Sequence, residues 1–327
     1  AEEGLLLLSK TLGASVPADL IIGTPSTAAV SRNTRSANVG GAVTANADSL
    51  YDLNDNNESV DSLTLIGGGD VQTGTGELTL DGNVIVGGYG GFGGTTSTID
   101  GRLRLGTSRY FTVAETGGLM GGGTDLVVNA HVREGAIIKD GTGGMSLTAS
   151  NSFQGSMQVE AGEVLLTHSH ALGSALQSGE VLLKGQSVLA LAGGIAITNC
   201  GLVIHSTNTT SGGPFQSRSG TNTWRDFVSL GLDDTIIRVA TNSLFLLEGM
   251  IRGEGGLTKT GAGILTFSGG ASNRYAGATR VLEGTLRLEN HTWPNRAIPG
   301  PLIIGDGVGI DLVEDRPASP RSMTLLR

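Results

Sequence analysis

The sequence is poor in the residues that hold many small secreted folds together. It has one cysteine, 8 prolines and 4% aromatic residues. One thiol cannot form an internal disulfide, and Cys200, which follows the strand-like run 195–198, is expected to be a buried structural thiol. With so few aromatic residues, the core must be built from Leu, Ile, Val and Ala.

Long apolar runs and excess positive charge are also missing. No run of 18 apolar residues and no signal peptide is present, so no membrane insertion by this segment is expected. The net charge of −9 excludes nucleic acid as a general partner, because like charges repel. Residue 1 is Ala, which predicts a removed leader or a fragment of a longer chain.

Glycine is the residue in excess, with 54 copies in 327 residues. Hydrophobic runs recur between the glycines, which argues against disorder. Collagen is excluded because glycine does not recur at every third residue. Helix is disfavoured because 3.6-residue stripes are missing and glycine costs about 1 kcal/mol per helical site. Short runs of alternating apolar residues, as in 264–267 and 286–288, instead predict strands joined by glycine turns.

One ordered motif occurs twice. It reads G-x-x-x-K-x-G-x-G, then N-x-[FY]-x-G, then V-x-x-G-x-[LV]-x-L, within blocks near 135–185 and 255–305. A partial block covers 4–23. The matching positions are Lys139 and Lys259, Gly141 and Gly261, Gly143 and Gly263, Asn151 and Asn273, Phe153 and Tyr275, Gly155 and Gly277, Val159 and Val281, and Gly162 and Gly284.

This pattern resembles the passenger-associated, or autotransporter-associated, β-strand repeat of bacterial surface proteins. Repeats that cannot bury their own hydrophobic face must stack, and strands of four to six residues with a turn at each corner suit a parallel β-solenoid. The resemblance implies the right-handed form. We therefore expect an all-β protein, a right-handed parallel β-solenoid with projecting loops, continuous over 1–327 and part of a longer repeat protein. A β-sandwich is the alternative, but it gives no reason for a repeat of about 120 residues.

The longest polar interruption is 207–226, which we expect to project as a loop. It contains Phe215, Trp224 and Arg225, and an exposed aromatic side chain there could bind sugar or protein. These three residues form the candidate ligand loop. The alternative is that Trp224 folds back as a small satellite core.

Candidate metal ligands are scattered. His168 and His170 could point to the same side of a strand, but no acidic or cysteine partner is near. Asp52, Asn54, Asp55, Asn57 and Glu58 form an oxygen-rich cluster that calcium would favour, although the EF-hand spacing is absent and the same residues form turns. The segment 122–127 faintly resembles one calcium-binding nonapeptide. No metal or cofactor is predicted.

Evidence for catalysis is equally thin. Glycoside cleavage needs convergent carboxylates, and the adjacent pairs Asp233-Asp234 and Glu314-Asp315 point to opposite faces if extended. The recurring Lys139 and Lys259 are interpreted as covering a strand edge or keeping the surface soluble. The sequence therefore predicts no catalytic residues.

These observations favour a non-catalytic structural rod, stalk or fibre segment of a bacterial surface or secreted passenger-type protein, located outside the cell or on its outer surface. An adhesin that binds a host protein or a glycan through its loops is the alternative. A β-helix polysaccharide-active enzyme is the third. End-to-end self-association or fibre assembly is also open, because solenoid ends expose unpaired strands.

Overall fold

The computed structural model describes residues 1–10, 13–36, 39–88, 95–116, 123–153, 156–173, 179–209, 212–289, 296–305, 309–312 and 323–325. Described residues form strands, turns and bends, and none of them is helical. No helix among them is long and apolar enough to cross a membrane.

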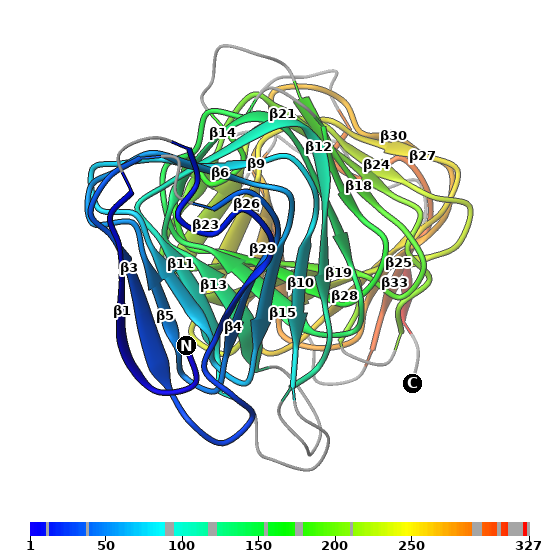
Figure 1. Cartoon of the computed structure of the whole chain (residues 1–327). Coiled ribbons are helices and arrows are strands. Elements are labelled where there is room, and N and C mark those ends of the chain that lie inside the picture. The colour runs from blue at the N-terminus through cyan, green and yellow to red at the C-terminus, as the bar shows by residue number, and fades with distance from the viewer. Residues whose placement is uncertain are drawn as a thin grey trace. The chain divides into compact units, whose positions relative to one another are not determined.

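The strands are short and follow one another along the whole described chain (Figure 1). The first eighteen are β1 (Gly4–Leu8), β2 (Leu20–Ile22), β3 (Ala29–Asn33), β4 (Val43–Asn46), β5 (Leu50–Asp52), β6 (Glu58–Val60), β7 (Leu63–Ile66), β8 (Asp70–Gln72), β9 (Leu78–Leu80), β10 (Val84–Gly87), β11 (Ser97–Asp100), β12 (Arg102–Val113), β13 (Thr124–Val128), β14 (His131–Asp140), β15 (Gly144–Leu147), β16 (Met157–Val159), β17 (Glu163–Leu166) and β18 (Gly179–Leu183). The others are β19 (Val188–Ala192), β20 (Ala196–Ile197), β21 (Cys200–Ile204), β22 (Phe215–Ser219), β23 (Thr221–Trp224), β24 (Val228–Leu230), β25 (Thr235–Val239), β26 (Leu244–Leu247), β27 (Ile251–Gly253), β28 (Leu257–Thr260), β29 (Ile264–Phe267), β30 (Arg274–Tyr275), β31 (Thr279–Val281), β32 (Thr285–Leu288), β33 (Leu302–Ile304), β34 (Gly309–Leu312) and β35 (Met323–Leu325).

Two compact units are distinguished by their internal contacts. Unit 1 consists of Ala1–Met157, Gly162–Val164 and Ala171–Ser174, and unit 2 consists of Gln158–Ala161, Leu165–His170 and Ala175–Arg327. Each unit is described by itself below. The expectation of one continuous solenoid over 1–327 stays a prediction.

Unit 1 contains two parallel sheets whose strands alternate along the chain. One sheet has the order β1-β3-β5-β8-β11-β13-β15, and the other has β2-β4-β7-β10-β12-β14, with β6 and β9 joined to it at β12. Val43 lies beside Leu63 and Leu63 lies beside Val84, so one coil takes about 20 residues. All three side chains are fully buried, and like residues stack on like residues from coil to coil.

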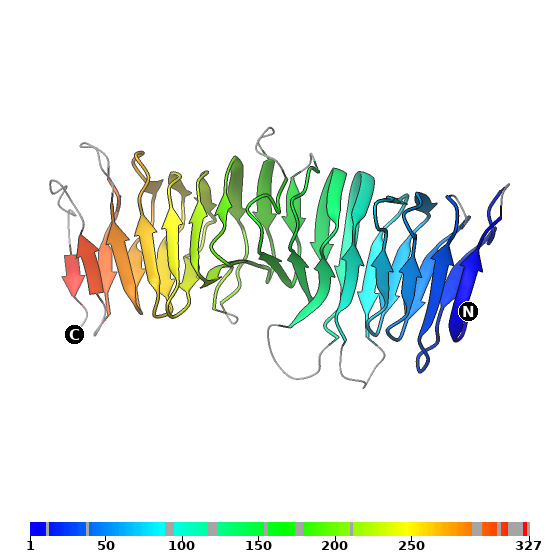
Figure 2. The same ribbon diagram turned by 90° about the vertical axis from the view of Figure 1, so that its left-hand side faces the viewer.

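Unit 2 uses three sheets per coil. Their orders are β19-β22-β25-β28-β31-β33-β35, β18-β21-β24-β27-β30 and β20-β23-β26-β29-β32-β34. In the third sheet Phe245 stacks on Leu265, and Leu265 stacks on Leu286, all with buried side chains. Figure 2 shows the strands of such a sheet lying side by side in one direction. The predicted all-β parallel solenoid is confirmed.

Cys200 is also where it was expected to be. Its thiol is buried and free, and burial raises its pKa to about 12. The side chain packs as a small hydrophobe at the start of β21 rather than as a reactive group.

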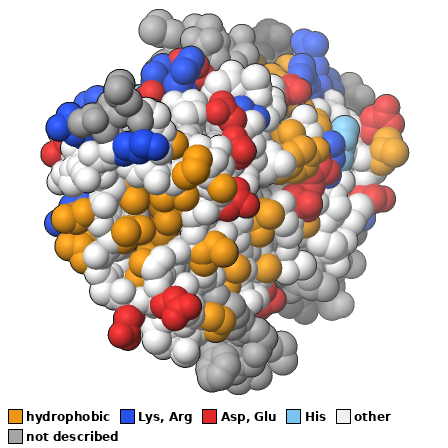
Figure 3. Space-filling model, viewed as in Figure 1, with side chains coloured by type: hydrophobic (Ala, Val, Ile, Leu, Met, Phe, Trp, Pro, Cys, Tyr) orange, Lys and Arg blue, Asp and Glu red, His pale blue; other side chains and the backbone are white. Residues whose placement is uncertain are grey.

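Exposed hydrophobic side chains occur on the edge strands of unit 1. Leu5 and Leu7 of β1 are 56% and 54% exposed, and Ile21 of β2 is 57% exposed. In the space-filling view, hydrophobic side chains gather in patches between the charged ones on the face seen there (Figure 3). β1 and β2 are the first strands in the order of their sheets, and Ala1 binds the carbonyl oxygen of Ile21 and the N–H of Gly23.

Candidate functional sites: the repeat corners and an acidic pocket

The two recurring lysines lie inside the protein, at the corner that follows their strands. Lys139 near the end of β14 and Lys259 in β28 both have no exposed surface. The interpretation that these lysines cover a strand edge or a soluble surface is therefore wrong. The reason is that each ammonium group donates to backbone carbonyl oxygens of the corner, at least two for Lys139 and three for Lys259, and these bonds offset the loss of water.

The corner around Lys259 shows the arrangement in full. Its Nζ donates to the carbonyl oxygens of Thr260 at 2.9 Å, Gly261 at 2.5 Å and Glu283 at 3.0 Å. The Glu283 carboxylate in turn accepts from the backbone N–H of Gly261 at 2.8 Å. One lysine thus joins two successive coils, because Glu283 belongs to the coil after the one that carries Lys259.

The corner around Lys139 has the same chemistry. Its Nζ donates to the carbonyl oxygens of Asp140 at 2.9 Å and Gly141 at 2.8 Å. Gly141 has φ +79° and its counterpart Gly261 has φ +75°, a left-handed conformation that turns the carbonyl oxygens toward the ammonium group.

The last glycine of the motif closes each corner. A Cβ on Gly162 would lie 2.5 Å from the carbonyl oxygens of Gly141 and Gly143 and 2.9 Å from the Nζ of Lys139. A Cβ on Gly284 would lie 2.5 Å from the carbonyl oxygen of Gly261. Only glycine allows the next coil to approach the corner this closely, which explains why the motif requires it there.

The asparagine of the motif joins coils on both of its sides. The Oδ1 atom of Asn273 accepts from the N–H of Ile251 at 2.8 Å, while its Nδ2 atom donates to the carbonyl oxygen of Ala297 at 2.8 Å. Asn151 makes the same pair of bonds, to the N–H of Val132 at 2.8 Å and to the carbonyl oxygen of Ala171 at 2.7 Å. Both asparagines are at least 95% buried.

Replacement of Asn273 by Ala should lower the free energy of unfolding by about 2–4 kcal/mol, because it removes the acceptor of the buried N–H of Ile251 and one bond to the part-buried carbonyl of Ala297. The control is Asn83→Ala, which removes one exposed bond to the N–H of Tyr110 and should cost about 1 kcal/mol or less. Urea denaturation followed by circular dichroism measures both. Equal losses in the two variants would contradict the bridging role of Asn273.

The aromatic position of the motif belongs to the core. Phe153 and Tyr275 are 5% and 2% exposed, and the Tyr275 hydroxyl pairs with the hydroxyl of Thr279. Burial raises the pKa of Tyr275 far above its usual range, and burial together with the nearby Glu58 carboxylate does the same for Tyr51 in unit 1.

These buried groups predict an unusual alkaline profile. Burial lowers the pKa of Lys139 and of Lys259 to about 8. Between pH 8 and about 10 the unfolded chain binds more protons than the folded chain through these two lysines, which outweighs the one proton that the folded chain keeps on Cys200 from about pH 9, so the free energy of unfolding should rise with pH. Above about pH 10 the folded chain keeps the protons of Tyr51 and Tyr275 that the unfolded chain loses, so stability should fall. Urea midpoints at pH 7.5, 9.5 and 11 measure the profile, and a fall between pH 7.5 and 9.5 would contradict it.

The candidate ligand loop is not where the sequence placed it. Phe215 starts β22 and Trp224 ends β23, both are fully buried, and their rings meet edge to face at 5.5 Å. Over 215–224 the expectation of a projecting loop is therefore wrong, since these aromatic rings fill the coil interior. Arg225 is exposed, and its guanidinium pairs with Glu248 at 3.1 Å. Ligand binding by Arg225 stays a prediction.

The candidate metal ligands bond to other protein groups, His168 within a turn and Asp52 and Glu58 to residues of β3. His168 accepts through Nδ1 from the N–H of His170 at 3.0 Å. Asp52 pairs with Arg32 at 2.6 Å, and the Glu58 carboxylate, 4% exposed, accepts from the side chain of Asn33 at 2.9 Å. Within the described residues, no group of three or more His, Cys, Asp or Glu side chains is arranged to hold a metal ion.

The other members of the oxygen-rich cluster bond within their own turn or to the next coil. Asn54 has φ +47° and its N–H donates to the Asp52 carboxylate, while Asp55 and Asn57 accept from the N–H groups of Thr75 and Glu77. These contacts give the cluster a structural role. Calcium binding there was an alternative that the sequence left open, and no observation of the structure tests it. The segment 122–127 lies partly outside the described residues.

The two carboxylates of the pair Asp233-Asp234, considered above as candidate catalytic acids, have different surroundings. Asp234 pairs with Arg280 and accepts from the N–H of Gly256 at 3.0 Å. Its neighbour Asp233 lines a pocket. Glu314 and Asp315 lie outside the described residues.

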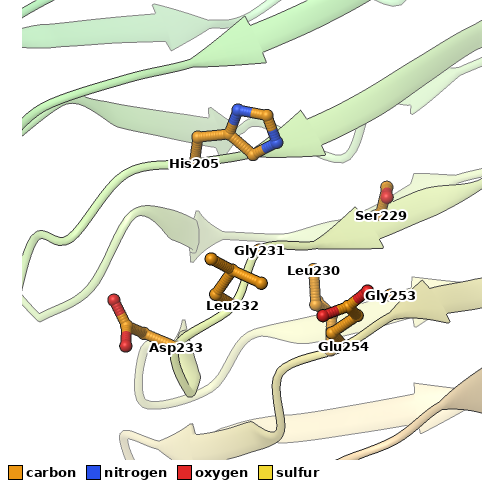
Figure 4. A pocket seen from close by; sticks show the side chains of 8 residues that line it. All are labelled: His205, Ser229, Leu230, Gly231, Leu232, Asp233, Gly253 and Glu254. Atoms are coloured by element: carbon orange, nitrogen blue, oxygen red, sulfur yellow. The ribbon is translucent and has the colours of Figure 1, made fainter.

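That pocket, at one corner of unit 2, was not found from the sequence as a site. It has a volume of about 420 Å³ and is lined by His205, Ser229, Leu230, Gly231, Leu232, Asp233, Gly253 and Glu254 (Figure 4). These residues follow or end β21, β24 and β27, which are neighbours in one sheet. The signal in the sequence is weak: polar residues and glycine recur just after three apolar runs, and only stacking brings them together.

Comparison with known families agrees with the geometry of the corners. A family model described as the passenger-associated-transport-repeat matches residues 137–166 and 257–288, which contain Lys139 and Lys259. The chain thus contains two copies of this repeat, folded as coils of a parallel β-solenoid, which fits an autotransporter passenger β-helix. A search of curated proteins returned no match. A search of solved structures returned none either.

Proposed function

With two passenger-associated transport repeats in a parallel β-solenoid as the premise, we propose that this chain is a non-catalytic structural segment of a bacterial surface or secreted passenger protein. It acts as a stiff rod or stalk outside the cell, or as part of an extracellular fibre. The observation that carries the proposal is that the recurring polar positions of the motif hold neighbouring coils together. The polar side chains of the repeat, Lys259 and Asn273 in the second copy, bind backbone groups of neighbouring coils.

Such a motif supports mechanical strength rather than chemistry. Its charged and polar groups are buried and satisfied, so they are not free to meet a substrate. Continuous parallel pairing along each sheet adds hydrogen bonds from coil to coil without any disulfide. A segment built in this way suits a spacer that resists unfolding and holds other regions at a distance.

The location outside the cell is tested with antibodies raised against the purified chain. Intact producing bacteria or their culture fluid should bind the antibody, and added proteinase should remove the signal from intact cells. A cytosolic protein of known location serves as the control for cell leakage. Antibody signal that appears only after lysis would overturn the proposal.

The non-catalytic role needs its own measurement. The purified chain should release no product from a panel of polysaccharides above the level of a heat-denatured sample. Turnover that is lost on Asp233→Asn or Glu254→Gln would instead support the polysaccharide-active alternative.

Fibre assembly is the second form of the structural role, in which exposed apolar side chains such as those of Leu5, Leu7 and Ile21 would be buried between copies. Electron microscopy of the purified chain across protein concentrations distinguishes the two forms. Uniform filaments that shorten in a Leu5→Lys/Leu7→Lys variant would support fibre assembly. Single particles at all concentrations would support the spacer.

A further inference from the structure

The pocket at the ends of β21, β24 and β27 has a construction that the repeat does not explain. It lies outside residues 137–166 and 257–288, and its side chains come from three successive corners: His205, Leu232 with Asp233, and Glu254. Its volume of about 420 Å³ falls within the range typical of ligand sites, about 300–1,000 Å³.

Glycines hollow this corner. A Cβ on Gly231 would lie 2.7 Å from the carbonyl oxygen of Ile204, and a Cβ on Gly253, where φ is +123°, would lie 2.1 Å from the carbonyl oxygen of Leu230. The coils therefore approach closely here without side chains that fill the space outside them. Buried Leu230 contributes an apolar surface to the pocket.

The wall of the pocket is unusually apolar for an exposed corner. Leu232 is 80% exposed, more than any other large hydrophobic side chain that the structure describes. In Figure 4 its side chain lies between those of Asp233 and Glu254. An exposed leucine flanked by two carboxylates leaves apolar surface and negative charge side by side.

Neither carboxylate has a counter-ion within the described residues. No hydrogen bond or ion pair is found for the side chain of Asp233 or of Glu254, whereas Asp234 pairs with Arg280. Arg252, one residue from the pocket, stacks over the ring of Phe227 at 4.0 Å. The two arginines near the pocket, Arg252 and Arg280, are thus engaged elsewhere, while His205 lines the pocket itself.

We propose that this pocket is a docking site for an arginine side chain of a protein partner, with an apolar residue beside it. The aliphatic stem of arginine packs on apolar surface such as that of Leu230 and Leu232, while its guanidinium forms charge-assisted bonds with carboxylates such as Asp233 and Glu254. A chain with a net charge of −9 also attracts basic partners at long range. This interaction site goes beyond the structural role proposed above and does not depend on it.

The test uses the full chain and the peptide acetyl-Leu-Arg-Gly-Leu-Arg-amide, with binding measured by isothermal titration calorimetry at low salt. The matched peptide carries citrulline, which has the shape of arginine without its charge. Wild-type protein should bind the arginine peptide saturably and the citrulline peptide at least about tenfold more weakly. Higher salt should weaken the binding of the arginine peptide but not that of the citrulline peptide.

Protein variants locate the site. The double variant Asp233→Asn/Glu254→Gln should bind the arginine peptide about tenfold more weakly than the wild type does. The variant Leu232→Ser should bind both peptides more weakly. The matched control is Asp61→Asn/Glu180→Gln, which removes the same charge from two exposed positions outside the pocket and should leave binding unchanged. Circular dichroism confirms that each variant is folded.

Four results would overturn the inference. Equal binding of both peptides would exclude recognition of charge, and equal losses in the pocket variant and the control variant would reduce the effect to net charge. Absence of saturable binding, or binding of a neutral oligosaccharide such as cellotriose that the pocket variant loses, would exclude an arginine partner. Each of these leaves the antibody test of location unaffected, so the two proposals fail independently.

Discussion

Replacement of Lys259 by Met is expected to lower the free energy of unfolding by about 3–5 kcal/mol, although the two side chains have similar length. The Nζ atom of Lys259 donates to three backbone carbonyl oxygens, and methionine offers none of these donors. The Gly261 carbonyl is buried, and a buried carbonyl left without a donor costs about 1–3 kcal/mol, while the part-buried bonds to Thr260 and Glu283 add less.

The matched control for this substitution is Lys184→Met. Lys184 pairs with Glu160 at 2.8 Å and its side chain is 40% exposed, so its loss should cost about 1 kcal/mol or less. Because a stacked solenoid need not unfold in one step, amide hydrogen exchange of Gly261 and Gly263 should accompany the urea midpoint. If Lys259→Met lowers the free energy of unfolding no more than Lys184→Met does, the bonds of Lys259 do not hold the coils together.

Replacement of Trp224 by Ala should have the second large effect, about 3–5 kcal/mol. The indole is fully buried and packs edge to face on Phe215, so its removal leaves a cavity in the coil. Its Nε1 atom has no partner among the protein atoms, so Trp224→Phe should cost clearly less than Trp224→Ala.

The neighbouring residue supplies the control. Arg225→Ala removes an exposed ion pair with Glu248 and should cost about 1 kcal/mol or less. Urea midpoints and tryptophan fluorescence report the order of the variants. If Trp224→Ala left stability unchanged and abolished binding of a ligand, the original interpretation of this residue as part of a ligand loop would be restored.

Much of the fold could be predicted because it depends on local pattern. Alternating apolar residues between glycines, as in 286–288, correctly indicated short strands with one buried face. The ordered Lys, Asn and Gly positions, found twice, correctly indicated the repeat, which the family match over 137–166 and 257–288 supports.

The roles of those residues could not be predicted in the same way. A lysine in a sequence indicates a charge that water usually solvates, and the carbonyl ring around Lys259 includes the oxygen of Glu283, 24 residues away in the next coil. Likewise, Asn273 bonds to Ile251 and Ala297, and neither partner is close to it in the sequence.

Periodicity along the chain is a one-dimensional property, so the amino-acid order was sufficient for strands, turns, the repeat and the stacked class of fold. Burial is different, because it depends on which coils lie above and below a residue. Only stacking placed Trp224 in the interior rather than on a loop, and only stacking brought His205, Leu232 and Glu254 to one pocket. The physical reason is that a polar or aromatic side chain here is buried mostly by contacts with neighbouring coils, whose residues are about 20 or more positions away in the sequence.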